Sequence, residues 1–208
     1  DVGDVTVVLE VYDAAGNMTS CEATVTVVDE TAPVIACIGS PGAVEYMEEF
    51  EGATIPSGWS SEILAGADDW TYGSGATSTG DDFNSNAVVF DDDAAGPGNT
   101  NALSLTSPAY DLTTADAATL SYDVGFEEAG NQEFVVEAWD GAAWQQIALY
   151  DADLGGITAS GDIDVLAYAN AAFQVRFTYD DLGGWGWYAG IDNFMLTVNT
   201  PPQPPLEL

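Results

Sequence analysis

The sequence of 208 residues predicts an all-β sandwich. Short segments alternate apolar and polar residues with the period of two that is typical of half-buried strands. No segment keeps a helical period, and Gly, Asp and Asn residues separate the segments at the spacing found in β-sandwiches. The length suffices for one good β domain with a smaller piece, or for two small domains.

Two strands joined by a Gly-rich loop are predicted over residues 173–198. The first seven residues alternate apolar and polar side chains, which indicates a strand with one buried face. The loop carries Asp181, Trp185 and Tyr188 among glycines, and a closing strand begins with Asp192 at its start. Because this segment unites a carboxylate at a strand end, an aromatic loop and the only basic residue, we expect a site here or directly across from it.

An isolated β-hairpin is predicted at the start of the chain. Residues 4–12 and 21–28 are rich in β-branched side chains and alternate over most of their length. The segment DAAGNMTS between them has the Asp, Gly and Asn residues of a turn. Two strands alone are marginally stable in water, so this hairpin needs a partner.

The hairpin resembles the last two strands of the Ig-like HYR repeats of bacterial surface proteins. The matching segments are VYDAAGN, CEATVTVV and DETAPVIAC. The resemblance implies that residues 1–30 are a fragment of an Ig-like domain, whose earlier strands are either trimmed away or supplied by another chain. Residues 31–45, interrupted by Pro and Gly, are predicted to be a linker.

Residues 46–199 are predicted to form the main domain, and residues 200–208 a Pro-rich tail. The turn residues Asp140 and Gly141 between two apolar segments are a strong hairpin signal. The motifs FEGATIPSGW, LTSPAYDL, WDGAAW and GIDNF follow in this order. They resemble the MAM-like jelly rolls of bacterial secreted proteins, of the choice-of-anchor or cleaved-adhesin type.

The resemblance implies a fold class for the whole chain: all-β, with a two-sheet jelly-roll sandwich preceded by a β-hairpin from an incomplete Ig-like domain. It also implies structural calcium, which is common in these jelly rolls. Proteins of this kind are secreted or lie on the cell surface, and they adhere to cells, proteins or glycans.

The charge of the chain is extreme, with 35 acidic residues against one basic residue, Arg176, and a formal net charge of −34. Nucleic acid is excluded as a partner, because one cation does not neutralise its phosphates. No apolar run is long enough for membrane insertion. Such a surface repels itself unless salt or divalent cations screen it. We expect a secreted or cell-surface location in calcium-containing saline, as a mature piece of a longer exported protein; the alternative is an acidic surface that serves only solubility.

Calcium is the predicted cofactor, because Ca²⁺ takes six to eight oxygen ligands. The first and last strands of a jelly roll are neighbours, so Glu51 and Asp192 are expected to converge, and the family resemblance implies acidic residues at both positions. Glu49 shares the Glu51 face of an extended segment and is expected to assist. Asp91 and Asp93 belong to a second oxygen-rich loop. For each set, the alternative is a group of solvated carboxylates.

Aromatic residues in Gly-rich segments suggest another kind of site. Sugar rings stack on exposed aromatic faces, so Trp185 with Asp181 and Tyr188 is a candidate ligand-binding set. The alternative is burial, since aromatic side chains more often lie in the core. Trp139 and Trp144 flank the predicted turn and are expected to pack across it.

Arg176 is predicted to be a structural clamp, because a guanidinium can bridge two carboxylates. The alternative is a receptor for a carboxylate of a ligand. Cys21 and Cys37 allow one disulfide in an oxidising compartment, and two unpaired thiols are the alternative.

The sequence predicts no enzyme. It lacks His and Lys and has no G-x-S-x-G elbow, although its composition leaves a paired-carboxylate glycosidase open. We predict a calcium-supported extracellular adhesion or ligand-binding module of a bacterial surface or secreted protein, whose partner is a cell-surface protein or a glycan. The alternatives are a structural subunit of a filament or surface layer, completed by strands from neighbouring copies, and a glycan-binding accessory domain of a secreted hydrolase.

Overall fold

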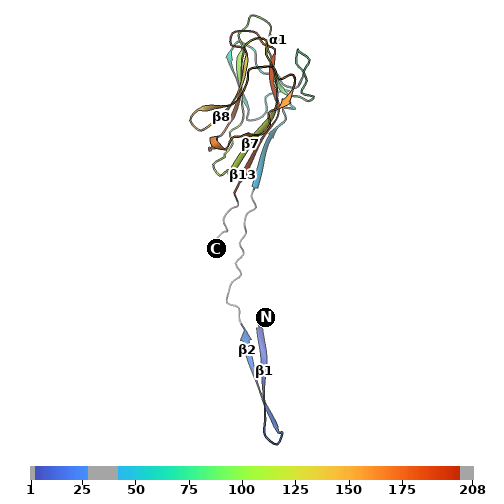
Figure 1. The fold of residues 1–208 in the computed structure, drawn as a ribbon, viewed down its shortest axis with the longest axis vertical. Coiled ribbons are helices and arrows are strands. Elements are labelled where there is room, and N and C mark those ends of the chain that lie inside the picture. The colour runs from blue at the N-terminus through green and yellow to red at the C-terminus, as the bar shows by residue number, and fades with distance from the viewer. Residues whose placement is uncertain (1–2, 28–41, 202–208) are drawn as a thin grey trace. The chain divides into compact units, whose positions relative to one another are not determined.

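The computed structural model describes residues 3–27 and 42–201, which belong to two compact units (Figure 1). The first unit is an antiparallel hairpin of β1 (Gly3–Tyr12) and β2 (Met18–Val27). Its turn is held by Asp13, whose carboxylate accepts hydrogen bonds from the backbone N–H groups of Ala15 and Asn17. The predicted hairpin is confirmed, and its second strand begins three residues earlier than the alternation indicated.

The second unit is a two-sheet jelly-roll sandwich. One sheet has the strand order β10–β7–β13–β3, with β5 also paired to β13 and β11 to β7, and the other has the order β4–β6–β12–β8–β9. The elements of this unit are β3 (Gly42–Glu48), β4 (Ser60–Ala65), β5 (Val88–Asp91), α1 (Asp92–Ala95), β6 (Ala102–Thr106), β7 (Ala117–Glu127), β8 (Glu133–Trp139), β9 (Trp144–Tyr150), β10 (Thr158–Ala159), β11 (Ile163–Asp164), the 3-10 turn η1 (Leu166–Tyr168), β12 (Val175–Asp180) and β13 (Tyr188–Thr200).

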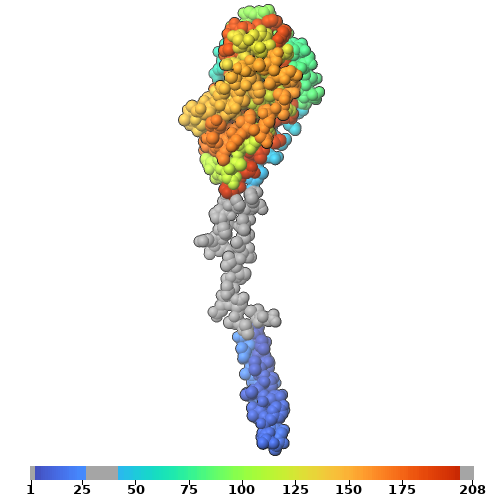
Figure 2. Space-filling model, viewed as in Figure 1, coloured from blue at the N-terminus to red at the C-terminus, as the bar shows by residue number. Residues whose placement is uncertain are grey.

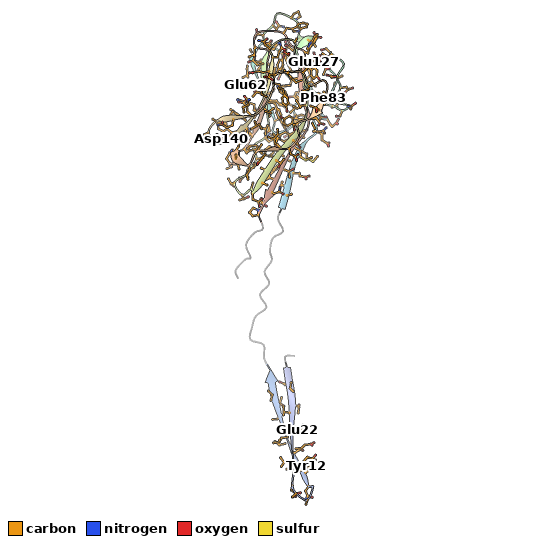
Figure 3. All side chains as sticks on the ribbon, in the orientation of Figure 1. Tyr12, Glu22, Glu62, Phe83, Glu127 and Asp140 are labelled. Carbon is orange, nitrogen blue, oxygen red and sulfur yellow. The ribbon has the colours of Figure 1, made fainter. Side chains whose placement is uncertain are left out.

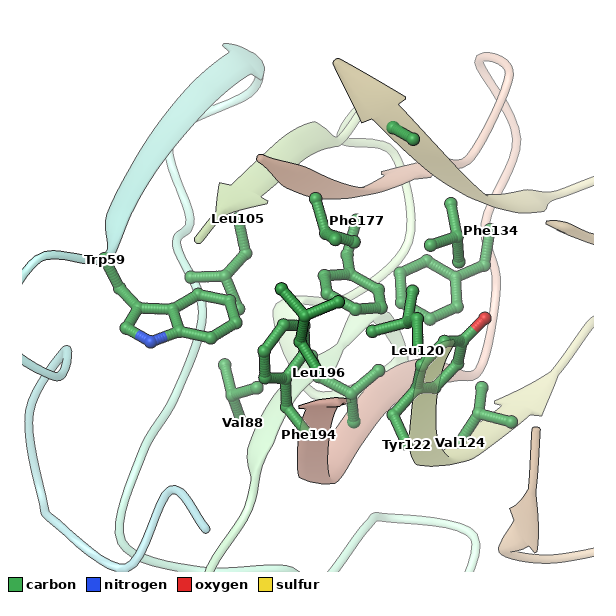
Figure 4. Packing of buried hydrophobic residues seen from close by; sticks show 14 of the residues in the cluster. Trp59, Val88, Leu105, Leu120, Tyr122, Val124, Phe134, Phe177, Phe194 and Leu196 are labelled. Carbon is green, nitrogen blue, oxygen red and sulfur yellow. The ribbon is translucent and has the colours of Figure 1, made fainter. Parts of the chain in front are cut away.

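The core lies between the two sheets and is rich in aromatic rings (Figure 4). Every second residue of β8 and β12 points into it, so Phe134 and Phe177 are fully buried. The ring of Phe177 lies 6.2 Å from that of Phe134 and 6.4 Å from that of Phe194 in the opposite sheet. Tyr122 of β7 meets Phe177 edge-on at 5.1 Å. The apolar residues whose alternation predicted β12 therefore make the contacts between the two sheets.

Three parts of the sandwich differ from the sequence prediction. β4 was not predicted because its sequence, SSEILA, does not alternate polar and apolar residues. α1 was not predicted because four residues are too few to show a helical period. β3 begins at Gly42, inside the expected linker 31–45. The closing strand begins at Tyr188, so Asp192 lies within β13 and not at its start. The rest of the expected linker and most of the tail 200–208 lie outside the described residues.

The side chains of the sandwich pack into one continuous body (Figure 2). Helical structure contributes little, since α1 and η1 span four and three residues. Within the described ranges, no helix is long and apolar enough to cross a membrane.

Candidate functional site

The candidate site lies where β13 bulges beside β7. The register between these strands shifts between Asp192 and Met195, and Asn193 has a positive φ of 49°. Such a bulge adds a residue to one strand and re-aims its side chains. Here the carboxylate of Asp192 reaches Ser85, in the segment that leads into β5.

Two adjacent polar residues join Asp192 to Glu51. The hydroxyl of Ser85 donates to Oδ2 of Asp192 at 2.7 Å, and Nδ2 of Asn86 donates to the backbone carbonyl of Glu51 at 2.7 Å. The structure thus brings Glu51 and Asp192 together from opposite ends of the jelly roll. Their role in binding calcium stays a prediction.

Asp192 is a buried acid, with 1% of its surface exposed. Burial raises the pKa of this carboxyl above its ordinary value, and the negative charges of Asp123 and Glu51 add to the rise. The hydrogen bonds from Ser85 and from the backbone of Asn193 lower the pKa but do not cancel the effect of burial. A cation beside Asp192 would stabilise its charged form, so the site favours cations over anions.

The carboxylates of Asp192 and Glu51 are too few to complete the coordination of a calcium ion, which takes six to eight oxygen ligands. Among residues 3–27 and 42–201, no group of three or more Asp, Glu, His or Cys side chains is placed to hold a metal ion. Calcium at Asp192 and Glu51 would therefore take most of its ligands from carbonyl and amide oxygens and from water, all of which Ca²⁺ accepts. The expected position of Glu49 is wrong: β3 ends at Glu48 and Phe50 has a φ of 47°, so Glu49 and Glu51 do not share one face of an extended segment.

The acidic run 91–93 makes structural contacts. Asp91 caps α1 by accepting a hydrogen bond from the backbone N–H of Ala94 at 3.0 Å. Its carboxylate also accepts bonds from the N–H and the hydroxyl of Ser78, at 2.7 and 2.8 Å. Asp93 donates its N–H to the carbonyl of Trp187 at 3.1 Å. These contacts account for Asp91 without a metal, and a calcium role for Asp91 and Asp93 stays a prediction.

Asp92 and Asp181 belong to a buried polar network that the sequence did not reveal. Asp92, 1% exposed, accepts hydrogen bonds from the hydroxyl of Tyr179 at 3.0 Å, and from Gly186 N–H and Asn101 Nδ2 at 2.7 Å. Asp181 is fully buried and accepts from the backbone N–H of Asn101 at 2.7 Å. Asp181, predicted to face a ligand, is instead an internal anchor of the loop after β12. The available signal was Tyr179 at an inward position, whose hydroxyl needs a buried partner.

Of the two aromatic residues predicted to bind a ligand, Trp185 is partly exposed and Tyr188 is buried. Tyr188 is fully buried and its hydroxyl donates to Asp81 at 2.6 Å, so the prediction that it faces a ligand is wrong. Burial raises the pKa of Tyr188, and the bond to Asp81 raises it further. Trp185 is half-buried, and its ring lies 5.3 Å from that of Trp187. Trp185 therefore remains a candidate for contact with a ligand.

Arg176 acts as a clamp on one carboxylate and not on two. Its Nε and Nη2 atoms both bond Oε2 of Glu137 at 2.7 Å, and its guanidinium lies 4.4 Å from the centre of the Trp144 ring. Trp144 and Trp139 pack across the β8–β9 turn, as predicted, with ring centroids 5.5 Å apart. The single cation of the chain is thus paired internally.

Two shallow hollows on the sandwich are lined by carboxylates. Their volumes are about 200 and 230 Å³. The acidic lining residues are Asp81, Glu127 and Asp153 in the first hollow, and Asp68, Asp69 and Asp91 in the second. Such linings repel anions and accept neutral or cationic groups.

Cys21 lies exposed on β2. Cys37 lies outside the described residues, so the disulfide between them stays a prediction.

Solved structures share the fold of the sandwich, whereas no family model and no curated protein matches the chain. The K1 cleaved adhesin domain of Lys-gingipain from Porphyromonas gingivalis W83 is 18% identical, with a TM-score of 0.55 over 74% of this chain and 97% of that one. The K3 cleaved adhesin domain of the same protein is 16% identical, with a TM-score of 0.56 over 75% and 99%. The predicted resemblance to cleaved-adhesin jelly rolls is therefore confirmed at the level of the fold, and the HYR resemblance of the hairpin stays a prediction.

A mutant of a family 29 carbohydrate-binding module also matches, with 13% identity and a TM-score of 0.47 over 75% of this chain and 92% of that one. A likeness at this level carries no argument about the ligand.

Proposed function

We propose that this chain is a non-catalytic binding module of a secreted or surface protein of bacteria, in which the jelly roll adheres to a cell-surface protein or a glycan. The observation that carries the proposal is the fold, which the sandwich shares with two cleaved adhesin domains over nearly their whole lengths. Two buried acids serve the fold and not a reaction, which supports a binding module over an enzyme. Asp92 and Asp181 are both buried, and their carboxylates accept hydrogen bonds from within the chain.

The ligand is neutral or cationic in this proposal. The formal net charge of −34 and the carboxylate lining of both hollows oppose an anionic partner. A glycan without acidic groups and a protein surface rich in Lys or Arg both satisfy this condition. The half-buried pair of Trp185 and Trp187 favours the glycan, because a sugar ring can stack on an aromatic face.

Calcium supports the fold in this proposal, with Glu51 and Asp192 as its carboxylate ligands. Calcium would supply positive charge at a place where burial and two neighbouring carboxylates raise the pKa of Asp192. Two hydrogen bonds support this assignment: the hydroxyl of Ser85 donates to the carboxylate of Asp192, and Nδ2 of Asn86 donates to the backbone carbonyl of Glu51.

Binding of the full chain to a glycan array and to immobilised cell-surface proteins, with calcium present, tests the proposal. We expect binding without release of reducing sugar. The variant Trp185→Ala should lose glycan binding, whereas Trp139→Ala, which removes a half-buried Trp from the β8–β9 hairpin, should keep it. A chain that binds neither class of partner, or that hydrolyses the glycan, contradicts the proposal.

A further inference from the structure

The two faces of the hairpin have opposite character. Each residue of β1 lies opposite a residue of β2, from Gly3 with Val27 to Tyr12 with Met18, and opposed residues point to the same side. One side, here called the apolar face, holds Val5, Val7, Leu9, Val11, Cys21, Ala23 and Val25, with Thr19 at one end. The other side, the polar face, holds Tyr12 and Glu22, which are labelled in Figure 3, together with Asp4, Glu10, the Ser and the other Thr residues of the two strands, and also Val8 and Met18.

Within the hairpin itself, no residue covers the apolar face. Val5 and Val7 are 51% and 50% exposed, Val25 is 49% exposed and Leu9 is 63% exposed. Two strands without a further layer are marginally stable in water. A sheet with one apolar and one polar face is typical of a sheet that packs its apolar face against a second layer. The hairpin therefore requires a partner on this face.

Charge limits which partner can cover it. The acidic residues of the two strands, Asp4, Glu10 and Glu22, all lie on the polar face. Because the chain has 35 acidic residues and one basic residue, most contacts between two copies would oppose or bury unpaired carboxylates. The apolar face brings no carboxylate into such a contact. Two copies joined there also direct their polar faces away from each other and into solvent.

We propose that the apolar face binds the apolar face of a second copy of this chain. The two hairpins then form a four-stranded, two-layer sandwich with two-fold symmetry. The side chains of the two faces would bury on the order of 1,000 Å² in total, which is below the roughly 1,200–2,000 Å² of stable specific interfaces and in the range of weak ones. The dimer is therefore dependent on concentration. This inference goes beyond the proposed function, because it involves neither calcium nor the ligand.

Sedimentation of the full chain from low micromolar to millimolar concentration tests the proposal. We expect a monomer–dimer equilibrium in the natural sequence. Leu9→Glu puts a carboxylate in the middle of the apolar face and should raise the dimer dissociation constant at least about tenfold. Val8→Glu adds the same charge to the adjacent residue, which is 49% exposed on the polar face, and should leave the dissociation constant within about twofold.

Cross-linking provides a second readout that does not perturb the face. In a Cys37→Ser chain, a short bismaleimide should join Cys21 of one copy to Cys21 of the other. Moving the thiol to the polar face, with Ser20→Cys and Cys21→Ser in the same background, should abolish the cross-link.

Three outcomes overturn the proposal. A chain that stays monomeric at millimolar concentration excludes a second copy as the partner. A dimer that Leu9→Glu leaves intact uses another surface, for example a strand added at an edge of the hairpin. Equal cross-linking through position 20 and position 21 shows contact without a defined face.

Discussion

At the scale of the residue, the buried acid Asp192 allows a direct test of the proposed calcium site. Because burial raises its pKa, the charged form is unfavourable in the folded state, and this carboxyl favours folding less as the pH rises through its folded pKa. We therefore expect Asp192→Asn to be at least as stable as the natural sequence at neutral pH in EDTA. With calcium at a hundredfold its dissociation constant, the natural sequence should gain about 2.7 kcal/mol, or roughly 5–10 °C in melting midpoint, and the variant should not.

The matched control for this experiment is Asp162→Asn, at an exposed acid that makes no side-chain hydrogen bond in the described chain. It should respond to calcium like the natural sequence. Equal midpoints in EDTA and calcium for the natural sequence, together with a metal analysis that finds no calcium, would contradict a calcium site.

Tyr179 allows a test of the buried network around Asp92. Its hydroxyl donates to Asp92 at 3.0 Å inside the core. Tyr179→Phe leaves the ring in place but removes one donor from a buried carboxylate, so unfolding should become easier by about 1.5–3 kcal/mol. Tyr168→Phe is the control, because the hydroxyl of Tyr168 makes no hydrogen bond in the described chain. Urea denaturation measures both, and equal losses would show that the bond to Asp92 contributes nothing.

At the scale of the element, Asp140 lies in the turn of the β8–β9 hairpin (Figure 3) and accepts several hydrogen bonds there. Hydrogen bonds from the backbone N–H groups of Ala143 and Ala142, and from the side chain of Gln145, lower the pKa of Asp140. A lowered pKa means that this carboxylate stabilises the fold above its unfolded pKa, and that the contribution is lost as the pH falls through the folded pKa.

Asp140→Ala should therefore lower the melting midpoint at neutral pH, and the difference should disappear on acidification. Melting curves at a series of pH values measure this, with Asp151→Ala as a control at an exposed acid without such bonds. An NMR titration should place the pKa of Asp140 below the ordinary Asp value. A destabilisation that persists unchanged in acid would indicate that packing, and not the charge, accounts for it.

At the scale of the whole molecule, the division into two units predicts independence of the sandwich from the hairpin. Deleting residues 1–28 should leave the melting midpoint of the sandwich unchanged, because its core contains no residue of β1 or β2. The same deletion should remove self-association. Calorimetry and sedimentation of the shortened chain measure the two effects. A sandwich that unfolds without the hairpin would show that the units are coupled.

Local patterns in the sequence were sufficient to predict β12 and the β8–β9 turn. The alternation in β12 reports which side chains are buried, since successive residues of a strand point to opposite faces. Asp140 and Gly141 mark the β8–β9 turn because Gly141 supplies the positive φ of 95° that the turn needs. The order of motifs along the main domain indicated the jelly roll.

Only the tertiary structure decided what each acid does. Asp181 and Asp192 both lie in or beside a Gly-rich aromatic segment, yet one anchors a loop and the other lies beside Glu51 and Asp123. Their partners are remote in sequence: Asn101 is 80 residues from Asp181, and Ser85 is 107 residues from Asp192. A periodic pattern reports the burial of neighbouring residues, whereas the hydrogen-bond partners of a loop or bulge depend on which distant segments the packed sheets bring together. For that reason the alternation of apolar and polar residues was enough to predict the β-sandwich, whereas the partners of Asp181 and Asp192 became known only from the packing of its sheets.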